Sequence, residues 1–148
     1  MTQEAHDYLM GSGGVSASFL EIGTVHKGEV ISYEKRQQRD MISGEKKFWD
    51  DGDPMWQLVF TIQTDENDPE VDDDDGVRRI FAKAQMLTAI REAIRKSGHK
   101  GNLAGGTLAV KYEADGESKG RGLNPPKIYR AQYVAPVEVQ AFEESKRD

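Results

Sequence analysis

The sequence predicts a mainly β fold, a five-stranded Greek-key barrel with one α-helix between its third and fourth strands. The first observation behind this class is the order of the segments. Three segments with alternating apolar and polar residues are followed by one with a helical period and then by two more alternating segments. The second observation is that the first segment is long and contains glycines, which allow a strand to bend around a barrel.

The first two expected strands lie at residues 19–34 and 55–64. The earlier segment, FLEIGTVHKGEVISYE, is rich in β-branched residues, and Gly23 and Gly28 are the points where it is expected to bulge and bend. The later segment alternates regularly, so one face carries the large apolar residues and the other is mainly polar. The residues on the apolar face are Leu58, Phe60 and Ile62.

The third expected strand covers residues 76–83 and places Ile80 and Ala82 on one face. Its opposite face would carry Arg79, Phe81 and Lys83. A one-residue slip of the register would instead turn Phe81 into the core. Residues 65–76, which hold eight of the 26 acidic residues and a proline, then form a hairpin loop between the second and third strands.

The apolar period changes to about 3.6 over residues 85–98, which predicts the single helix, with Gly98 ending it in the left-handed region. Alternation returns over residues 105–116 and 127–134, the expected fourth and fifth strands. The connection between them is rich in Gly, Asn and Pro and is expected to be mobile. The apolar stripe of the helix consists of Met86, Leu87, Ile90, Ala93 and Ile94.

This order of elements is that of the OB-fold. Four strings between about residues 19 and 136 resemble the OB-fold single-stranded DNA-binding proteins, and more closely the small type encoded by bacteriophages. They are GTVHKGEVISYEKRQQRD, GEKKFWDDGDPMWQLVFTIQTD, DDGVRRIFAK and GLNPPKIYRAQY. The resemblance implies that a nucleic-acid strand crosses the face of strands two and three and is held by the loops that join strands one to two and four to five.

The organisation expected is a flexible N-terminal segment at residues 1–17, one OB-fold domain at 18–136 and a tail at 137–148. No long apolar run indicates a membrane span or a secretion signal. The chain has no cysteine, which fits a reducing compartment. We therefore expect a cytoplasmic protein, located in the host cytoplasm if a phage encodes it.

The formal net charge of −6 hides segments of opposite sign. Residues 50–76 hold eleven acidic and no basic residues, residues 1–23 hold three acids, and residues 135–148 hold four acids and two bases. The rest of the chain carries 18 basic and 8 acidic residues, a net of +10. Because salt screens a charge within roughly 8–10 Å, such a locally basic surface can still attract a polyanion.

The candidate nucleic-acid-binding residues gather in the two expected loops and on the face of strands two and three. Cations there neutralise phosphates, and exposed rings stack on unpaired bases. Trp56 could equally cap the barrel, and Tyr129 could equally pack in the core, whereas Trp49 has only Phe48 as an apolar neighbour. The candidates are Lys35, Arg36, Arg39, Lys46, Lys47, Phe48, Trp49, Trp56, Arg79, Phe81, Lys83, Lys119, Arg121, Lys127 and Tyr129, with Gln57 and Gln63 on the floor.

The acidic hairpin at residues 65–76 has two interpretations. It is a solvated linker in the simpler one, since like charges repel. In the other it is an electrostatic decoy that lies near Arg78, Arg79 and the basic loops and competes with weakly bound nucleic acid. Clustered carboxylates on such a loop lack the rigid placement that metal-dependent catalysis needs, so no catalytic residue, metal or cofactor is expected.

The function expected is binding of single-stranded DNA without enzymatic activity, largely independent of sequence, to protect the strand in replication or recombination. RNA as the ligand, contacts with replication or recombination proteins, and self-association through a sheet edge are left open. The C-terminal string VQAFEESKRD contains two basic residues, which puts in doubt the acidic partner-recruiting tail that such proteins commonly have. The alternative is an OB-like protein-interaction module, structural or regulatory, whose acidic loop contacts a basic partner.

Overall fold

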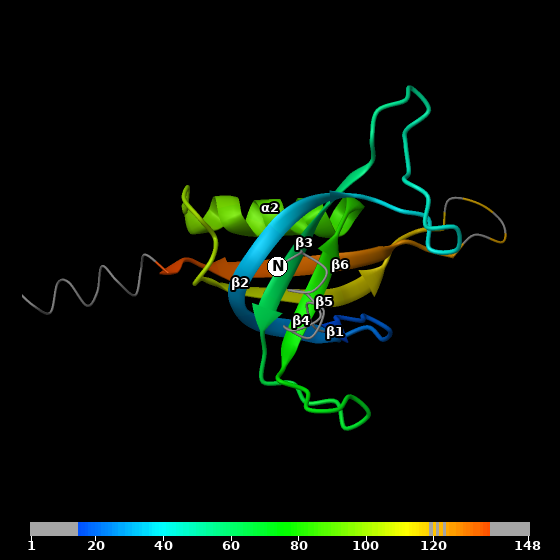
Figure 1. Cartoon of the computed structure of the whole chain (residues 1–148). Coiled ribbons are helices and arrows are strands. Elements are labelled where there is room, and N and C mark those ends of the chain that lie inside the picture. The colour runs from blue at the N-terminus through cyan, green and yellow to red at the C-terminus, as the bar shows by residue number, and fades with distance from the viewer. Residues whose placement is uncertain (1–14, 119, 121, 123, 137–148) are drawn as a thin grey trace, which may run out of the picture.

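Six strands and one helix form the described part of the chain, which covers residues 15–118, 120, 122 and 124–136 of a computed structural model. The fold is mainly β, as predicted (Figure 1). In this part of the chain, no helix is long and apolar enough to cross a membrane. The elements are β1 (Val15–Ser16), β2 (Val25–Gln37), β3 (Trp56–Gln63), β4 (Val77–Ala82), α2 (Ala84–Ser97), β5 (Thr107–Asp115) and β6 (Lys127–Val134).

Strand β2 is shared between two halves of one sheet, whose strand order is β1-β4-β3-β2-β5-β6. Its first residues pair antiparallel with β5, and its later residues pair antiparallel with β3 after a register shift between Val30 and Ser32. The prediction of a long, curved first strand is therefore confirmed. Its predicted start at residue 19 is wrong, because a turn in which the Thr24 N–H donates to the Glu21 carbonyl precedes the strand.

The sheet is open: the described residues pair β4 with β3 and β1, and β6 with β5, so the pairings do not close a barrel. The free edge of β4 is instead met by residues predicted to be flexible. Val15 and Ser16 pair in parallel with Arg78 and Arg79, and the Ala17 N–H donates to the Arg79 carbonyl at 2.8 Å. This short strand gives no periodic signal, because two residues are too few to show alternation.

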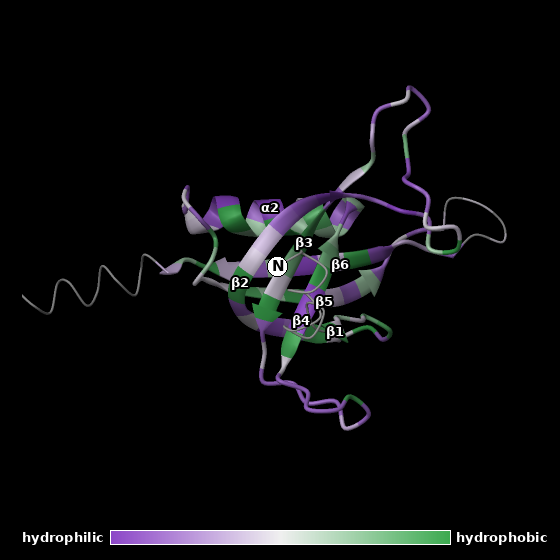
Figure 2. Ribbon diagram, in the orientation of Figure 1, coloured by the Kyte–Doolittle hydropathy of each residue, from purple (hydrophilic) through white to green (hydrophobic). Residues whose placement is uncertain are grey.

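The core lies between the curved sheet and helix α2, and the alternating positions of the strands supply it (Figure 2). Phe60, Ile62 and Ile80 are almost completely buried, which confirms the predicted register of β3 and β4. On the helix, Met86, Ile90 and Ala93 are buried, and Leu87 and Ile94 pack against the core from its margin. Gly98 caps the helix C-terminus with a φ of 73°, as predicted.

A side-chain amide joins the helix to the outer strand β6. The Tyr129 N–H donates to Gln85 Oε1 at 2.6 Å, and Gln85 Nε2 donates to the Tyr129 carbonyl at 3.0 Å. Gln85 therefore bonds this residue as a neighbouring strand would, and it satisfies a main-chain donor and acceptor at the edge of the sheet.

Candidate nucleic-acid interface

The outer face of the β2–β3–β4 sheet carries the side chains that point away from the core. Direct cross-strand pairs place Arg36 opposite Gln57, and Val59 opposite Phe81. Phe81 and Arg79 are half-buried on this face, whereas Ile80 and Ala82 are buried on the other. The predicted orientation of Phe81 is thus confirmed, because the register of β4 does not slip.

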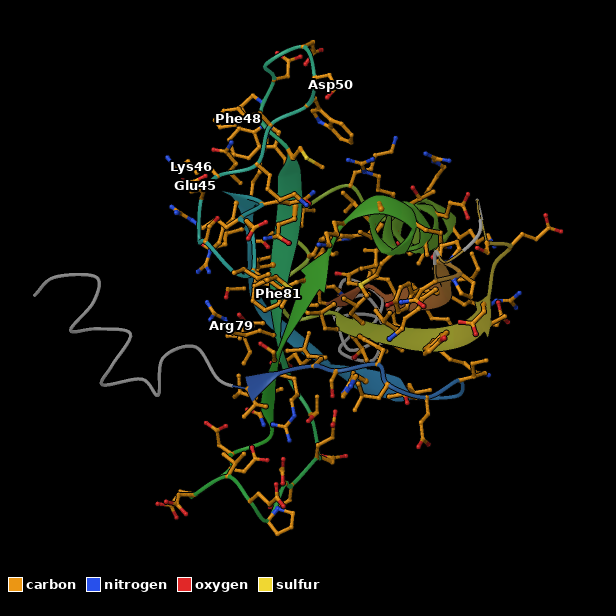
Figure 3. All side chains as sticks on the ribbon, turned by 90° about the vertical axis from the view of Figure 1, so that its right-hand side faces the viewer. Glu45, Lys46, Phe48, Asp50, Arg79 and Phe81 are labelled. Carbon is orange, nitrogen blue, oxygen red and sulfur yellow. The ribbon has the colours of Figure 1, made fainter. Side chains whose placement is uncertain are left out.

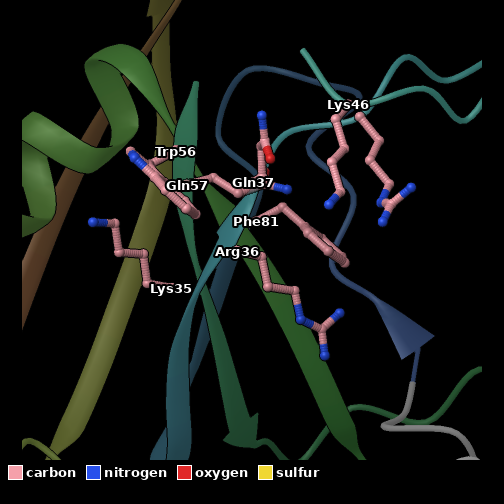
Figure 4. Close-up of a pocket in the computed structure, with 8 residues that line it drawn as sticks. Lys35, Arg36, Gln37, Lys46, Trp56, Gln57 and Phe81 are labelled. Carbon is pink, nitrogen blue, oxygen red and sulfur yellow. The ribbon is translucent and has the colours of Figure 1, made fainter. Parts of the chain in front are cut away.

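A hollow of about 520 Å³ lies beside the last residues of β2 and the first residues of β3, and we call it the basic groove. Four of its lining residues are cationic, two are aromatic and none is acidic. Figure 4 shows Lys35 and Trp56 on one side of the strands and Arg36, Lys46 and Phe81 on the other. The lining residues are Lys35, Arg36, Gln37, Arg39, Lys46, Trp56, Gln57 and Phe81.

Two aromatic rings of the groove lie next to cations. The Lys35 ammonium is 4.3 Å from the ring centroid of Trp56, and the Arg79 guanidinium carbon is 5.9 Å from that of Phe81. Arg36 forms an ion pair with Glu34 at the exposed surface of β2. Because this pair is open to solvent, it contributes little to stability, and its guanidinium can exchange the carboxylate for another anion.

The segment between β2 and β3, residues 38–55, is an ordered arm. At its base the Gln38 N–H donates to the Met55 carbonyl at 2.7 Å, and the Lys47 N–H donates to the Gln38 carbonyl at 2.8 Å. Arg39 and Lys46 face each other across an isolated bridge, which fixes two cations of the groove. The arm therefore holds these charges in place, although it lies outside the regular strands.

Two turns form the ends of the arm. In the first, the Ser43 and Ile42 N–H groups both donate to Asp40 Oδ1 at 2.8 Å, and these bonds hold the pKa of the Asp40 carboxyl below its usual value. This turn presents Met41 and Ile42 almost fully to solvent. In the second, the Trp49 N–H donates to the Asp53 carbonyl, and Trp49 is 57% exposed.

Figure 3 shows Lys46 and Phe48 on the arm, with Phe81 and Arg79 below them along the same side of the molecule. Phe48 and Trp49 are about half exposed and continue the cationic and aromatic surface beyond the groove. Lys47 is half-buried and contributes mainly its main chain to the arm. Lys83 is exposed at the end of β4, as the residue that precedes helix α2.

Two candidates of the β5–β6 region, Lys127 and Tyr129, do not line the groove. Lys127 Nζ donates to the Phe19 carbonyl at 2.5 Å and lies 5.0 Å from the ring centroid of Tyr112. Tyr129 packs edge-on against Phe19 at the margin of the core, which is the packing alternative expected for it. Lys119 and Arg121 lie outside the described residues.

The acidic hairpin lies at the other end of β3 from the arm (Figures 1 and 3). Since β3 has eight residues, the two loops are separated by about 26 Å along the strand. The expectation that the hairpin lies near the basic loop between the first two expected strands is therefore wrong. Its predicted proximity to Arg78 and Arg79 holds, because both residues stand at the near end of β4.

The hairpin is anchored by a buried ion pair. Arg78 donates from Nη1 to Asp74 Oδ1 at 2.9 Å and from Nη2 to Asp74 Oδ2 at 2.7 Å, and both side chains are almost fully buried. These bonds, with those from the Asp68 and Gly76 N–H groups, lower the pKa of Asp74 well below its usual value. Arg78 has the same strand parity as Ile80, and this parity is the sequence signal that points to its burial.

His26 joins the hairpin to the residues that precede β2. His26 is buried, with Nδ1 2.7 Å from Glu66 Oε2 and Nε2 2.7 Å from the Ser18 carbonyl oxygen. Glu66 also lies 3.6 Å from Nε of Arg78. Part of the hairpin is thus an anchored structure, whereas Asp65, Glu70, Asp72, Asp73 and Asp75 are exposed.

Comparison of the chain with protein-family models, with curated proteins and with solved structures found no match. Four cations and two aromatic rings line the hollow, and this combination suits a ligand with both negative charge and flat apolar surface.

Proposed function

We propose that the chain binds single-stranded DNA in the basic groove and protects the strand, with little sequence preference, in replication or recombination. The observation that carries the proposal is the composition of the groove: Lys35, Arg36, Arg39 and Lys46 line it together with Trp56 and Phe81, and none of its lining residues is acidic. The cations match the phosphates, and the rings match the faces of unpaired bases. The role is one of binding rather than catalysis.

The proposal includes an OB-like topology of the small phage-encoded type. Strand β2 serves both halves of the sheet, and helix α2 stands between β4 and β5, as the third-to-fourth connection of that fold requires. In such a fold the strand would cross β3 and β4 and reach the arm between β2 and β3. The groove lies at that place, which supports the proposal.

The test is a titration of the full chain with oligo-dT, followed by tryptophan fluorescence at several salt concentrations. Binding is expected to quench the fluorescence, and the logarithm of the binding constant should fall linearly with the logarithm of the salt concentration. Trp49→Ala and Trp56→Ala, measured separately, show which indole contacts the bases. Each ring that stacks on a base should cost about 1–3 kcal/mol of binding free energy when it is removed.

A titration without any response at low salt would overturn this proposal and favour an OB-like protein-interaction module. The exposed carboxylates of the hairpin are the observation behind that second candidate. They would contact a basic partner, for which oligolysine is a usable probe. Binding of oligolysine that is lost in the combined variant Asp72→Asn, Asp73→Asn and Asp75→Asn would support the module.

A further inference from the structure

The side-chain amide of Gln57 makes no hydrogen bond within the described part of the chain, unlike those of three other glutamines of β2, β3 and the arm. Gln37 Nε2 donates to the Lys47 carbonyl, Gln38 Nε2 to the Trp56 carbonyl and Gln63 Nε2 to the Asp75 carbonyl, at 3.0, 3.0 and 2.6 Å. Gln57 is half-buried and lines the basic groove, yet its amide has no hydrogen-bond partner among the residues that the structure describes. Its donor and acceptor are therefore available to a ligand in the groove.

The position of Gln57 places this amide beside the ring of Phe81. Gln57 lies two residues before Val59, which is directly opposite Phe81 on the neighbouring strand. Such diagonal neighbours are about 7–8 Å apart, within reach of a long side chain. A base that stacks on Phe81 would then turn one edge toward Gln57. Figure 4 shows Arg36, the cross-strand partner of Gln57, on the same side of the strands as Phe81. Its guanidinium would be close to the phosphate of such a nucleotide.

An amide group is complementary to the Watson–Crick edge of every base. Each edge has a donor next to an acceptor: N6–H and N1 in adenine, N4–H and N3 in cytosine, N1–H and O6 in guanine, N3–H and O4 in thymine. The amide offers an N–H and a C=O side by side, and rotation of its terminal torsion exchanges their places. It can therefore form two hydrogen bonds with any unpaired base, whereas a paired base has this edge occupied.

We propose that Gln57 recognises the free Watson–Crick edge of a base stacked on Phe81, and so selects unpaired over paired nucleotides without selecting among the four bases. This inference rests on the proposed function and adds to it the residue that distinguishes a single strand. The cations of the groove cannot make this distinction, because both single and double strands carry phosphates.

N3-methylthymidine is a probe that isolates the edge. A fully N3-methylated oligo-dT keeps the phosphates and the stacking faces of oligo-dT. Whichever of its bases lies beside Gln57, that base has no N3–H donor. The wild-type chain is expected to bind it roughly tenfold more weakly, because the methyl group removes the N3–H donor and also keeps the Gln57 amide from approaching O4 in the paired geometry. Gln57→Leu should bind both oligonucleotides equally, with an affinity near that of the wild type for the methylated one.

Two further variants separate recognition from folding. Phe81→Ala should weaken the binding of both oligonucleotides by a similar factor, because it removes stacking only. Gln57→Glu presents two acceptors, which match the N1–H and N2–H donors of guanine. It should lose affinity for oligo-dT and recover it on oligo-dT with interspersed deoxyguanosine. This recovery requires a folded groove, so it also shows that the substitution does not act by unfolding.

Equal binding of the two oligonucleotides by the wild type would overturn the inference while leaving the proposed function in place. Discrimination that persists in Gln57→Leu would also overturn it, since the methyl group would then act by its bulk. A wild-type chain that binds neither oligonucleotide at low salt would instead overturn the proposed function, and the role of Gln57 with it.

Discussion

The ammonium nitrogen of Lys35 lies over the indole of Trp56, 4.3 Å from the ring centroid. The two residues stand on neighbouring strands at the mouth of the basic groove, and both line it. A cation–π contact at an exposed site is worth about 0.5–1 kcal/mol, so a phosphate can draw the ammonium away at small cost. The contact thus keeps the charge in the groove without binding it tightly.

Lys35→Gln is expected to reduce the salt dependence of oligo-dT binding. If Lys35 neutralises one phosphate, its removal lowers the slope of log K against log salt by about 0.7, the value for single strands. The measurement is a fluorescence titration at four or more salt concentrations. Lys111→Gln is the matched control, since Lys111 is exposed on β5 and does not line the groove. An unchanged slope in Lys35→Gln would show that this ammonium meets no phosphate.

The acidic hairpin is expected to have little influence on binding in the groove. Its distance of about 26 Å along β3 exceeds the screening length of about 8 Å at physiological salt. The combined variant Asp72→Asn, Asp73→Asn and Asp75→Asn should therefore change the dissociation constant for oligo-dT by less than roughly twofold at 0.15 M salt. A large gain in affinity at this salt concentration would restore the idea of an electrostatic decoy.

Alternation along the strands predicted the parts of the fold that local pattern determines. Strand β6 begins and ends at the predicted residues 127 and 134, and the helix differs from its prediction by one residue at each end. The faces of β3 and β4 were also correct, so Phe81 and Gln57 could be placed in the groove from sequence. These features depend on the burial of one face of each strand, and this burial appears in the sequence as an alternation of apolar and polar residues.

Features that depend on distant contacts were not predictable in this way. Val15–Ser16 pairs with β4, and Tyr129 packs on Phe19. Each of these contacts joins segments that are far apart in the sequence, and no local pattern of residues indicates which distant segments will meet. The position of the acidic hairpin could be predicted from the order of the strands, because consecutive antiparallel strands put successive loops at opposite ends of the sheet. Lys127 and Tyr129 do not line the groove, because their closeness in sequence to a predicted loop does not bring them close to the arm in space.

Asp74→Asn is expected to loosen the hairpin and lower the stability of the chain. The change leaves the buried guanidinium of Arg78 without its bidentate carboxylate. Urea unfolding should show a lower midpoint with an unchanged slope. Asp72→Asn is the control, because Asp72 is exposed on the same hairpin. Equal midpoints for the two variants would mean that the ion pair contributes nothing to the fold.

Gly28→Ala is expected to destabilise the crossing point of the sheet. Near Gly28, β2 passes from its pairing with β5 to its pairing with β3, and a Cβ atom there would lie 2.1 Å from the Gln63 carbonyl oxygen. Relief of such a clash requires a backbone shift, so a loss of about 1–3 kcal/mol or more in the free energy of unfolding is expected. Gly101→Ala is the control, since its Cβ would have only ordinary contacts. Similar stability of the two variants would contradict the close packing of β2 on β3.

The Tyr112 hydroxyl donates a hydrogen bond to Asp115 Oδ1, and this bond, with burial, raises the pKa of Tyr112 to about 12. The unfolded chain has a tyrosine pKa of about 10, so the folded state favours the protonated phenol. Its contribution to stability is fully present below pH 10 and is lost as the pH rises through about 12. Since Tyr129 and Tyr133 also have raised pKa values, the wild type must be compared with Tyr112→Phe.

The measurement is the free energy of urea unfolding of both chains between pH 8 and pH 12. Tyr112→Phe cannot ionise at this position, so the difference in stability between wild type and variant should shift toward the variant as the pH rises from 10 to 12. Tyr133 titrates in both chains and cancels in the difference, whereas the charge of Tyr129 interacts with Tyr112 and adds in the same direction, since it also raises the pKa of Tyr112. A constant difference across this range would mean that the bond to Asp115 does not hold the Tyr112 proton in the folded state.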